Sequence, residues 1–526
     1  MPSAARIFGK HFPIPIPPQL ADEATLLAHL GLSTKELKKI WWYRGRMYHQ
    51  FSIAKGAGKV RLITAPDRRL KILQSKLAPL LDQLYRVRHP VHGFVPARSV
   101  KTNAEAHGRR RFIVNLDLQD FFPTITENRV RGLLTSLNVD ARVAEIIARL
   151  CCFNSHLPQG ASTSPVISNM ICYRLDTELL RIAKGARAIY TRYADDITFS
   201  SYQPPAPLFE GALPPVGRFS RDLLALPLRG TFQSNGFTIN PDKSHYADRN
   251  SRRIVTGVKI NAGLNVDRRY VRHIRALLHS VETLGLADAN AKLVAAGGKG
   301  SLAAHLRGKI SYIAHLKGRT DPVVRNLALR YNTSFSHQPI RLVPTEEERR
   351  DRSVWIVEHS ANSGEQGTAF FLKDVGLVTA AHCVEGVSDF TVYHPTKPSN
   401  QASVTVLKRC EHRDLAILGH AVHDTEYFEL GAASRTTAVD DVVKAYGYPG
   451  YGPGDKINVR TGAVSSLPIK SAVQKIEVTQ ELAQGMSGGP ILDAHGEVIG
   501  IIHKGGPNEG RQLAIHIRVL QKWVQE

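Results

Sequence analysis

Positive charge is concentrated in the first two thirds of this sequence. Residues 1–350 carry a net charge of +27, whereas residues 351–526 carry a net charge of −4. A chain of 526 residues is too long for one compact core, so we expect two or three domains. A domain with so much positive charge repels itself unless a polyanion neutralises it. The division of charge therefore predicts that the first part binds nucleic acid and that the second part meets a different partner.

The pattern of hydrophobic residues also changes along the chain. From about residue 51 to 265, short β-type runs alternate with helical runs, which predicts an α+β domain with a small sheet. From about 268 to 335 the sequence is helical and basic. The polar, proline-containing segment 336–352 is the expected linker. Short strands and Gly/Pro turns then predict an all-β domain over 353–526.

The cysteines and the hydropathy indicate where such a chain works. The five cysteines show no metal-ligand spacing and, being odd in number, no disulfide framework, so we expect a reducing, cytoplasmic compartment. The N-terminal residues are broken by prolines and lack the apolar core of a signal peptide. No apolar run is long enough to span a bilayer, so no membrane partner is expected.

Two adjacent carboxylates, Asp195 and Asp196, lie within the β-type run RYADDITF. Side chains alternate between the two faces of a strand, so one carboxylate of the pair would point toward the core, where it is costly unless it is paired. A turn at the tip of a hairpin would leave both charges solvated. A divalent metal site would also account for the pair, because the cation takes hard oxygen ligands and cancels their repulsion.

A third carboxylate, Asp117 in VNLDLQDFFPTI, follows another hydrophobic run. A two-metal polymerase site needs carboxylates from separate strands around two ions about 3.5–4 Å apart. Asp117 together with Asp195 and Asp196 would meet this requirement. Asp120 is displaced from the metal-binding face of the strand, so we expect it to be solvent-facing or structural.

These segments resemble reverse transcriptases. RYADD is similar to the YxDD box of that family, NLDLQDFFPTI to its first aspartate strand, and LPQGASTSPVISN to its LPQGxxxSP loop. GFTINPDKS and GKVRLITAPDRRLKILQ are similar to its lysine-bearing segment and its fingers strand, and all five segments occur in the family's order. The resemblance implies a right-hand polymerase, with fingers and palm at about 20–265 and a helical thumb at about 268–335.

The resemblance also implies how the polymerase site is built. Asp117, Asp195 and Asp196 would hold two Mg²⁺ ions, for which Mn²⁺ could substitute. The catalytic step would be the addition of dNTPs to a growing DNA strand.

Five further residues match positions of the family that contact template or substrate. Phe122 would lie under the sugar and disfavour a 2′-OH, which makes dNTPs the substrate. Gln159 and Gly160 would position the template and the incoming nucleotide. Arg61 would contact the triphosphate, and Lys243 would protonate or neutralise the leaving pyrophosphate. For Arg61 and Lys243, ordinary surface cations remain the alternative.

Two short segments narrow the resemblance to the retron reverse transcriptases. TNAEAH and IVTG match the NAxxH and VTG signatures of that group, and VHGFVPARS is also similar. The match implies a partner, a cognate structured non-coding RNA, from whose guanosine 2′-OH the enzyme would prime branched multicopy single-stranded DNA (msDNA). A group II-like or diversity-generating enzyme is the alternative. Residues of the two signatures and of the basic thumb are the expected RNA contacts: Asn103, His107, Thr256, Gly257, Arg268, Arg269, Arg272 and Tyr312.

Three motifs in the second part of the chain carry a different chemistry. VTAAHCV contains His382, RDLAIL contains Asp414, and GMSGGPIL contains Ser487. A serine hydroxyl is a poor nucleophile unless a neutral imidazole takes its proton and a buried carboxylate orients that imidazole. Glycines beside Ser487 allow backbone N–H groups to turn toward an oxyanion. The order His, Asp, Ser predicts a nucleophilic serine triad.

The three motifs resemble trypsin-like serine proteases of the chymotrypsin fold over 353–526. This resemblance implies an all-β double barrel that needs no cofactor, with Gly485 and Ser487 donating the N–H groups of the oxyanion hole. Met486 stands where many digestive members have the aspartate that pairs with a freed N-terminus. Activation by that route is therefore not expected.

Two residues give opposite indications of which side chain the protease accepts. VIGIIHKGGP resembles the wall of the glutamyl endopeptidases that receives an acidic side chain, and its histidine is His503. Glu481 lies six residues before Ser487, where an acidic residue favours a basic side chain. Because the motif that contains His503 is the longer of the two, we expect a preference for an acidic side chain at the P1 position of the substrate.

Taken together, these resemblances imply a bifunctional retron protein in the cytoplasm of a prokaryote. The first part would be an RNA-directed DNA polymerase, and the second a serine endopeptidase acting on an unknown protein, in antiphage defence by abortive infection. The alternative is a sensor scaffold bound to RNA and DNA, whose protease fold is a non-catalytic interaction module. The sequence leaves open a homo-oligomer.

Overall fold

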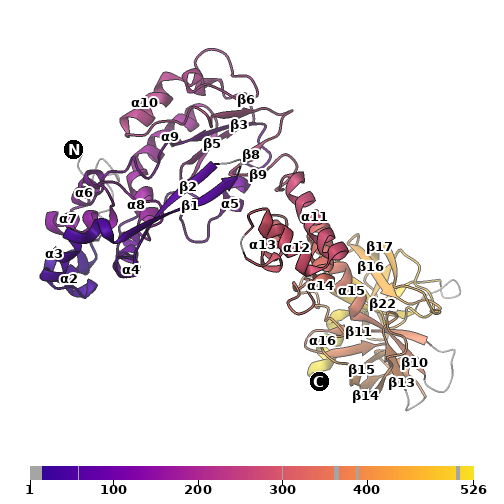
Figure 1. Cartoon of the computed structure of the whole chain (residues 1–526). Helices are drawn as coiled ribbons and strands as arrows, with labels where there is room; N and C mark the ends of the chain where they lie inside the picture. The colour runs from indigo at the N-terminus through magenta and orange to yellow at the C-terminus, as the bar shows by residue number, and fades with distance from the viewer. Residues whose placement is uncertain (1–14, 57–58, 299, 360–365, 387–389, 505–509) are drawn as a thin grey trace. The chain divides into compact units, whose positions relative to one another are not determined.

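The computed structural model describes residues 15–56, 59–298, 300–359, 366–386, 390–504 and 510–526. The chain divides into two compact units, Met1–Arg341 and Leu342–Glu526 (Figure 1). Residues 1–14, whose sequence lacks a signal-peptide pattern, lie outside the described residues. Among the residues described, no helix combines the length and apolar character needed to cross a membrane.

In the first unit, the 3₁₀ turn Pro18–Leu20 is followed by two short helices that are fixed by reciprocal caps. The Asp22 carboxylate accepts from Thr25 N, and the Ser33 hydroxyl accepts from Glu36 N, so that each helix has a satisfied first turn. A hairpin and a long helix follow. The elements are α2 (Glu23–Leu30), α3 (Thr34–Tyr43), β1 (Tyr48–Gly56), β2 (Lys59–Pro66) and α4 (Arg68–Gln83).

A five-stranded sheet forms the centre of the first unit, with strand order β4-β5-β3-β7-β6. Its strands are β3 (Phe112–Asp117), β4 (Ile189–Tyr193), β5 (Asp196–Ser201), β6 (Gly217–Arg218) and β7 (His245–Ala247). Leucine and isoleucine side chains of the adjoining helices share one hydrophobic core with this sheet. These helices are α6 (Glu127–Ser136), α7 (Ala141–Cys151), α8 (Ser164–Ile171), α9 (Tyr173–Gly185) and α10 (Leu226–Ser234). Helix α5 (Val100–Ala106) contacts β4.

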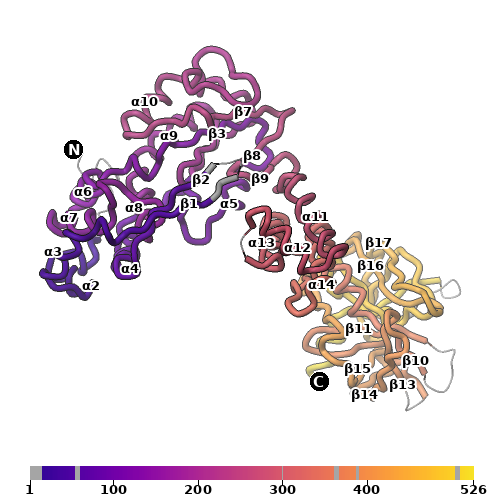
Figure 2. The backbone as a smooth tube through the Cα atoms, in the orientation of Figure 1, coloured from indigo at the N-terminus to yellow at the C-terminus, as the bar shows by residue number. Residues whose placement is uncertain are grey.

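Four helices complete the first unit after a small hairpin, and the backbone trace in Figure 2 shows them gathered into a bundle. Ile274, Leu306 and Leu327 are buried between them, which accounts for the helical periodicity of this basic segment. The hairpin consists of β8 (Ile254–Val255) and β9 (Val258–Lys259). The helices are α11 (Arg268–Leu284), α12 (Leu286–Ala295), α13 (Leu302–Lys317) and α14 (Pro322–Ser334).

The second unit contains two barrels. The first is closed in the order β10-β11-β12-β15-β14-β13. The second follows the order β17-β16-β20-β21-β22-β19, and an additional pairing of β17 with β19 closes it; β18 extends β19. The double barrel that the sequence predicts is therefore present.

The strands of the first barrel are β10 (Val354–His359), β11 (Gln366–Leu372), β12 (Gly376–Thr379), β13 (Phe390–Tyr393), β14 (Ala402–Cys410) and β15 (Leu415–His420). Those of the second are β16 (Val442–Gly447), β17 (Asn458–Ser466), β18 (Ile469–Lys470), β19 (Val473–Val478), β20 (Pro490–Leu492), β21 (Val498–Lys504) and β22 (Leu513–His516). Helix α16 (Ile517–Gln525) ends the chain.

The segment expected to be an irregular linker is partly helical. Helix α15 (Glu346–Ser353) occupies the end of that segment and belongs to the second unit. A capping box joins Thr345 and Glu348, acidic residues occupy the first turn, and Arg350 and Arg352 lie in the last turn. These charges complement the helix dipole, which explains why so polar a segment is helical.

Candidate active sites

The three aspartates predicted to bind metal lie at the same end of the central sheet. Asp117 is the last residue of β3, and its register partner is Asp196, the first residue of β5. Asp195 lies in the turn between β4 and β5, and its backbone carbonyl accepts a hydrogen bond from Leu118 N at 3.0 Å. All three residues line one cavity of about 840 Å³. The adjacent carboxylates therefore lie at a hairpin turn, and that turn faces a third carboxylate.

The electrostatics of this cavity suit a divalent cation. Burial, followed by the charge of Asp117, raises the pKa of Asp195. The Lys243 ammonium donates to both carboxylate oxygens of Asp117, at 2.7 Å and 2.8 Å. The carboxylate oxygens of the aspartates repel one another and attract a cation, here the Lys243 ammonium. Hard oxygen donors of this kind are the ligands that a divalent metal ion prefers. For Lys243 to act on a leaving pyrophosphate, it would have to exchange this carboxylate partner.

The residues predicted to contact template and substrate also border the cavity. Phe122, Gln159 and Arg61 line it. Gly160 lies against β2 with φ at +135°, and a Cβ at this position would be 2.9 Å from the Thr64 carbonyl oxygen. Thr64 N donates to the Gln159 carbonyl at 2.9 Å. The loop therefore docks on the hairpin strand in a conformation that only glycine adopts readily.

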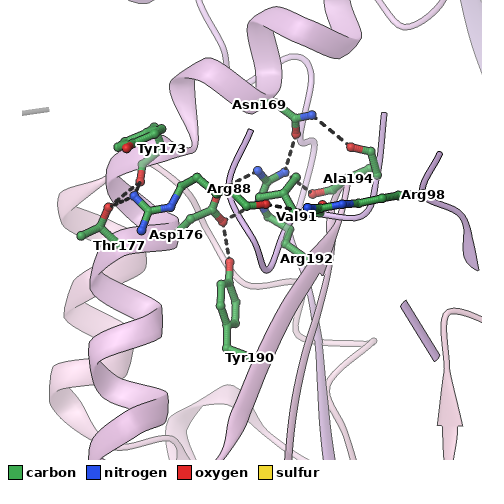
Figure 3. Close-up of polar contacts among 11 residues, drawn as sticks. Arg88, Val91, Arg98, Asn169, Tyr173, Asp176, Thr177, Tyr190, Arg192 and Ala194 are labelled. Carbon is green, nitrogen blue, oxygen red and sulfur yellow. Dashed lines mark hydrogen bonds and ion pairs between the residues drawn. The ribbon is translucent and has the colours of Figure 1, made fainter. Parts of the chain in front are cut away.

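A buried ion pair supports the turn that carries Asp195 (Figure 3). Arg192 is fully buried and donates through Nε and Nη2 to the two carboxylate oxygens of Asp176 in α9, both at 2.8 Å. Its Nη1 donates to the Asn169 side chain at 3.1 Å and to the Ala194 carbonyl at 3.2 Å. The Tyr190 hydroxyl also donates to Asp176, at 2.6 Å. Sequence reasoning missed this network; the arginine of RYADD, placed in a run of buried strand residues, was the available signal.

Two residues of the NAxxH retron signature, Asn103 and His107, are buried. Asn103 Nδ2 donates to Thr256 Oγ1 at 2.6 Å, so the NAxxH and VTG segments bind each other. His107 is fully buried, with Nδ1 2.6 Å from Ser200 Oγ and Nε2 2.7 Å from Thr191 Oγ1. The burial of Asn103 and His107 and their hydrogen bonds within the protein weigh against direct contact with RNA, and that contact stays a prediction.

Two other residues of the VTG segment remain accessible. Thr256 lines the cavity of the three aspartates, and Gly257 is exposed with φ at +78°. Whether they contact RNA stays a prediction.

The thumb residues predicted to bind RNA are accessible. Arg268, Arg269 and Arg272 are exposed on the first turns of α11. Tyr312 of α13 is half-buried, and its ring centroid lies 5.8 Å from that of Tyr270. A cationic helix end beside tyrosine rings suits contact with a nucleic-acid backbone and its bases, and this role stays a prediction.

The three triad residues of the second unit meet between its barrels. His382 lies in the 3₁₀ turn Ala381–Val384 after β12, Asp414 immediately precedes β15, and Ser487 immediately follows the Gly485-Met486 turn before β20. His382 Nδ1 lies 2.9 Å and 2.8 Å from the two carboxylate oxygens of Asp414, and His382 N donates to Asp414 Oδ1 at 2.9 Å.

Ser487 and His382 line one cavity of about 660 Å³. Within the described residues no hydrogen bond joins the Ser487 hydroxyl to the imidazole, a contact that often tightens only when substrate binds.

The pKa values of Asp414 and His382 shift in the directions that a catalytic triad needs. Burial alone would raise the pKa of Asp414, but hydrogen bonds from His382 and His503 lower it below its usual range. Burial alone would lower the pKa of His382, but the hydrogen bond with Asp414 and the neighbouring Cys383 raise it above 6.5. Asp414 is therefore ionised and makes the imidazole a stronger base.

The loop before Ser487 has the geometry of an oxyanion hole. Gly485 has φ at +91°, and a Cβ there would lie 2.7 Å from the Tyr448 carbonyl oxygen. Its own carbonyl accepts from Thr368 Oγ1 at 2.7 Å, which holds the turn. In the described part of the chain, neither Gly485 N nor Ser487 N donates to another protein group. Both N–H groups are free to bind an oxyanion.

The structure does not bring the two specificity candidates into the serine cavity. His503 Nδ1 lies 2.5 Å from Asp414 Oδ2, so its ring contacts the triad carboxylate. Glu481 is exposed and pairs with Arg460 at 3.6 Å. Neither residue is among those that line the cavity of Ser487. This placement weakens both predictions of substrate preference, and the bond of His503 to Asp414 is a contact that sequence reasoning did not foresee.

The fold and the two sites thus define a palm-type polymerase joined to a chymotrypsin-fold serine hydrolase. Residues 53–260 match the family model described as reverse transcriptase (RNA-dependent DNA polymerase). Residues 367–501 match the model described as trypsin-like peptidase domain. The predicted fold class and both predicted families are confirmed by these matches.

Curated relatives narrow the family of the first unit within the reverse transcriptases. The Retron Mx65 reverse transcriptase of Myxococcus xanthus is 37% identical over 284 residues, which cover 50% of this chain and 63% of that protein. The Retron Ec86 reverse transcriptase of Escherichia coli is 30% identical over 289 residues, covering 55% of this chain and 81% of that protein. The chain belongs to the retron reverse transcriptases. It spans less than two thirds of the length of the Mx65 relative.

Among solved structures, the serine endoprotease from Yersinia pestis is similar to part of this chain. The alignment has a TM-score of 0.30 and 23% identity, and it covers 35% of this chain and 66% of that chain.

Proposed function

We propose that the first unit copies a cognate structured RNA into single-stranded DNA and that the second unit is a serine endopeptidase controlled by the resulting RNA–DNA complex. The observation that carries the proposal is the meeting of Asp117, Asp195 and Asp196 in one cavity, beside Gln159 and Arg61. Membership of the retron reverse transcriptases supports an RNA partner and a DNA product. The bond between the NAxxH and VTG segments supports a structural role for these signatures in the polymerase.

In the polymerase, the three aspartates would hold two Mg²⁺ ions, for which Mn²⁺ could substitute. When bound, such ions activate the attacking hydroxyl and neutralise the triphosphate. Arg61 would orient the triphosphate. The Lys243 ammonium would leave Asp117 and bind the leaving pyrophosphate.

The aromatic ring beside the aspartates gives the polymerase its choice of sugar. The Phe122 ring would close the space that a ribose 2′-OH needs, so that dNTPs are the substrates. Its packing against Phe121, with ring centroids 5.2 Å apart, supports a fixed position for the ring.

In the peptidase, the Ser487 hydroxyl would attack a peptide carbonyl while His382 Nε2 takes its proton. Asp414 would keep the Nδ1–H tautomer of His382 and stabilise the imidazolium that forms. The N–H groups of Gly485 and Ser487 would bind the oxyanion. His382 would then protonate the leaving amine, and water would hydrolyse the acyl-enzyme.

A pair of single substitutions tests the two activities in one preparation. Purified protein is incubated with its cognate RNA and labelled dNTPs, and then with a fluorophosphonate that labels activated serines. Asp195→Asn is expected to abolish DNA synthesis. Ser487→Ala is expected to preserve DNA synthesis and to abolish labelling. Asp222→Asn and Ser434→Ala, which change exposed residues, are the matched controls and should retain both activities.

The outcome separates the proposal from a non-catalytic scaffold. DNA synthesis by the Asp195→Asn protein would contradict the polymerase assignment. A wild-type protein that makes DNA but is not labelled at Ser487, with or without that DNA, would show that the second unit is a binding module. In cells, the proposed defence role predicts that Ser487→Ala removes protection against phage while the DNA product is still made.

A further inference from the structure

We infer that His503 is a fourth member of the serine site, a positioning residue that binds Asp414 and sets the basicity of His382. The inference rests on the proposed peptidase activity and deepens it. It assigns His503 to the triad carboxylate rather than to recognition of the substrate side chain.

The geometry of Asp414 carries the inference. Its Oδ2 lies 2.8 Å from His382 Nδ1 and 2.5 Å from His503 Nδ1, so one carboxylate oxygen serves two imidazoles. The three groups all lie within 4.8 Å of one another. The side chains of Asp414 and His503 are 11% and 15% exposed, which strengthens hydrogen bonds to the carboxylate.

A local irregularity of the second barrel directs His503 to this position. In the pairing of β21 with β22, Ile502 lies opposite Ala514 and Lys504 opposite Leu513, so His503 is an extra residue without a register partner. Such a bulge turns one side chain away from the regular alternation. Ile502 also exchanges backbone hydrogen bonds with Gly488 and Gly489, each at 2.8 Å. The bulge is therefore fixed to the loop that carries Ser487.

The chemistry of the contact fixes which atom carries the proton. An ionised Asp414 accepts hydrogen bonds only, so both imidazoles must donate through Nδ1–H. The Nε2 atom of His382 is then the base that faces Ser487. The second donor spreads the negative charge of Asp414 over two partners, which leaves less of it to stabilise the imidazolium form of His382.

Other charged groups around the site stay the same when His503 is changed. His359, Cys383 and Glu385 line the cavity shared by His382 and Ser487. On the side of β14, Arg409 pairs with Glu385 at 3.6 Å and with Glu411 at 3.3 Å. A difference between variants at position 503 therefore reports the His503–Asp414 contact.

The test compares two substitutions, one that keeps a hydrogen-bond donor and one that removes it, in the full-length protein with its RNA–DNA product. His503→Asn keeps an N–H donor near the position of Nδ1, whereas His503→Phe fills the space without a donor. The rate of fluorophosphonate labelling of Ser487 is followed from about pH 5 to about pH 11, because the rate reports the neutral fraction of His382.

The two variants should behave differently. At the acid end of the profile, the labelling rate falls as His382 becomes protonated. The pH midpoint of this fall, the acid limb, should be the same in His503→Asn as in the wild type and about one pH unit higher in His503→Phe. An acid limb of His503→Phe that coincides with wild type would overturn the inference. Equal loss of rate in both variants without a shift would mean that the residue serves packing alone, and would also overturn it.

A measurement without catalysis keeps this result separate from the proposed function. In the Ser487→Ala protein, the His382 pKa is measured from ¹⁵N imidazole shifts with and without His503→Phe. The inference predicts a higher His382 pKa in the His503→Phe variant, and an unchanged value would contradict it. Failure of wild-type labelling at every pH would refute the peptidase, while the titration would still decide the role of His503.

Discussion

Replacing the buried arginine of the RYADD segment tests how the polymerase turn is held in place. Arg192→Met removes the guanidinium but keeps most of the side-chain volume. Asp176 is fully buried, and Figure 3 shows its carboxylate bonded to Arg192 and Tyr190. After the change, the Tyr190 hydroxyl is the partner that remains of these two. The substitution therefore leaves a buried carboxylate without its counter-ion.

The expected loss follows from the burial of both groups. Removing one partner of a buried ion pair costs about 3–5 kcal/mol of unfolding free energy, because the other charge stays desolvated. Removing both charges, in Arg192→Met with Asp176→Leu, should restore most of this free energy. Arg174→Met is the control: its ion pair with Glu178 on the same helix is 46% and 20% exposed, and its loss should cost about 0.5 kcal/mol.

Denaturant unfolding of the full chain measures these differences. The chain has four tryptophans, of which Trp41 and Trp42 lie in the first unit. In a background with Trp355→Phe and Trp523→Phe, their fluorescence reports the first unit alone.

The double variant separates stability from the positioning of Asp195. It should regain stability yet stay impaired in DNA synthesis, because Ala194 and Asn169 lose the donor that joins them. A loss below about 1 kcal/mol in Arg192→Met would refute the reasoning, as would a double variant no more stable than the single one.

Three further outcomes are expected. Phe122→Ala should raise the incorporation of rNTPs relative to dNTPs on the cognate RNA, and unchanged selectivity would remove the ring from the sugar contact. Gly488→Ala should abolish labelling of Ser487, because the added Cβ would lie 2.2 Å from Thr379 Oγ1 at a position with φ of +81°; retained labelling would show that the loop relaxes. Labelling of wild-type Ser487 should rise with pH through a midpoint above 6.5, because His382 acts as a base only when neutral and Asp414 raises its pKa; a midpoint below 6.5 would contradict that shift.

The sequence was most informative where the chemistry needs fixed residue types in a fixed order. A strand pair that presents Asp117 opposite Asp196 can be foreseen, because each aspartate ends or begins a hydrophobic run. The triad could be foreseen for the same reason, since His382, Asp414 and Ser487 each adjoin a short strand.

Contacts that depend on tertiary packing were not accessible from the sequence. Asn103 and His107 were expected to face RNA, but both side chains are buried. Asn103 donates to Thr256, and His107 bonds to the hydroxyls of Ser200 and Thr191. A motif indicates that a residue type is needed at a position. Whether its side chain bonds within the protein or contacts a ligand depends on how far it is buried.

His503 illustrates a second limit of sequence reasoning. A single bulge between Ile502 and Lys504 changes which way a strand residue points, and its position depends on how β21 pairs with β22. The Arg192–Asp176 pair is likewise invisible to periodicity, because the two residues lie on different elements.

The most direct measurement for the polymerase site is DNA synthesis on the cognate RNA by the Asp117→Asn protein, with Asp222→Asn as the control. Asp117 comes from a different strand than Asp195 and Asp196, and the amide side chain preserves its size while removing its charge. We predict that synthesis falls by at least about 1,000-fold, because one ligand shared by the metal pair is lost. Synthesis at the wild-type rate by a folded Asp117→Asn protein would contradict the three-carboxylate site.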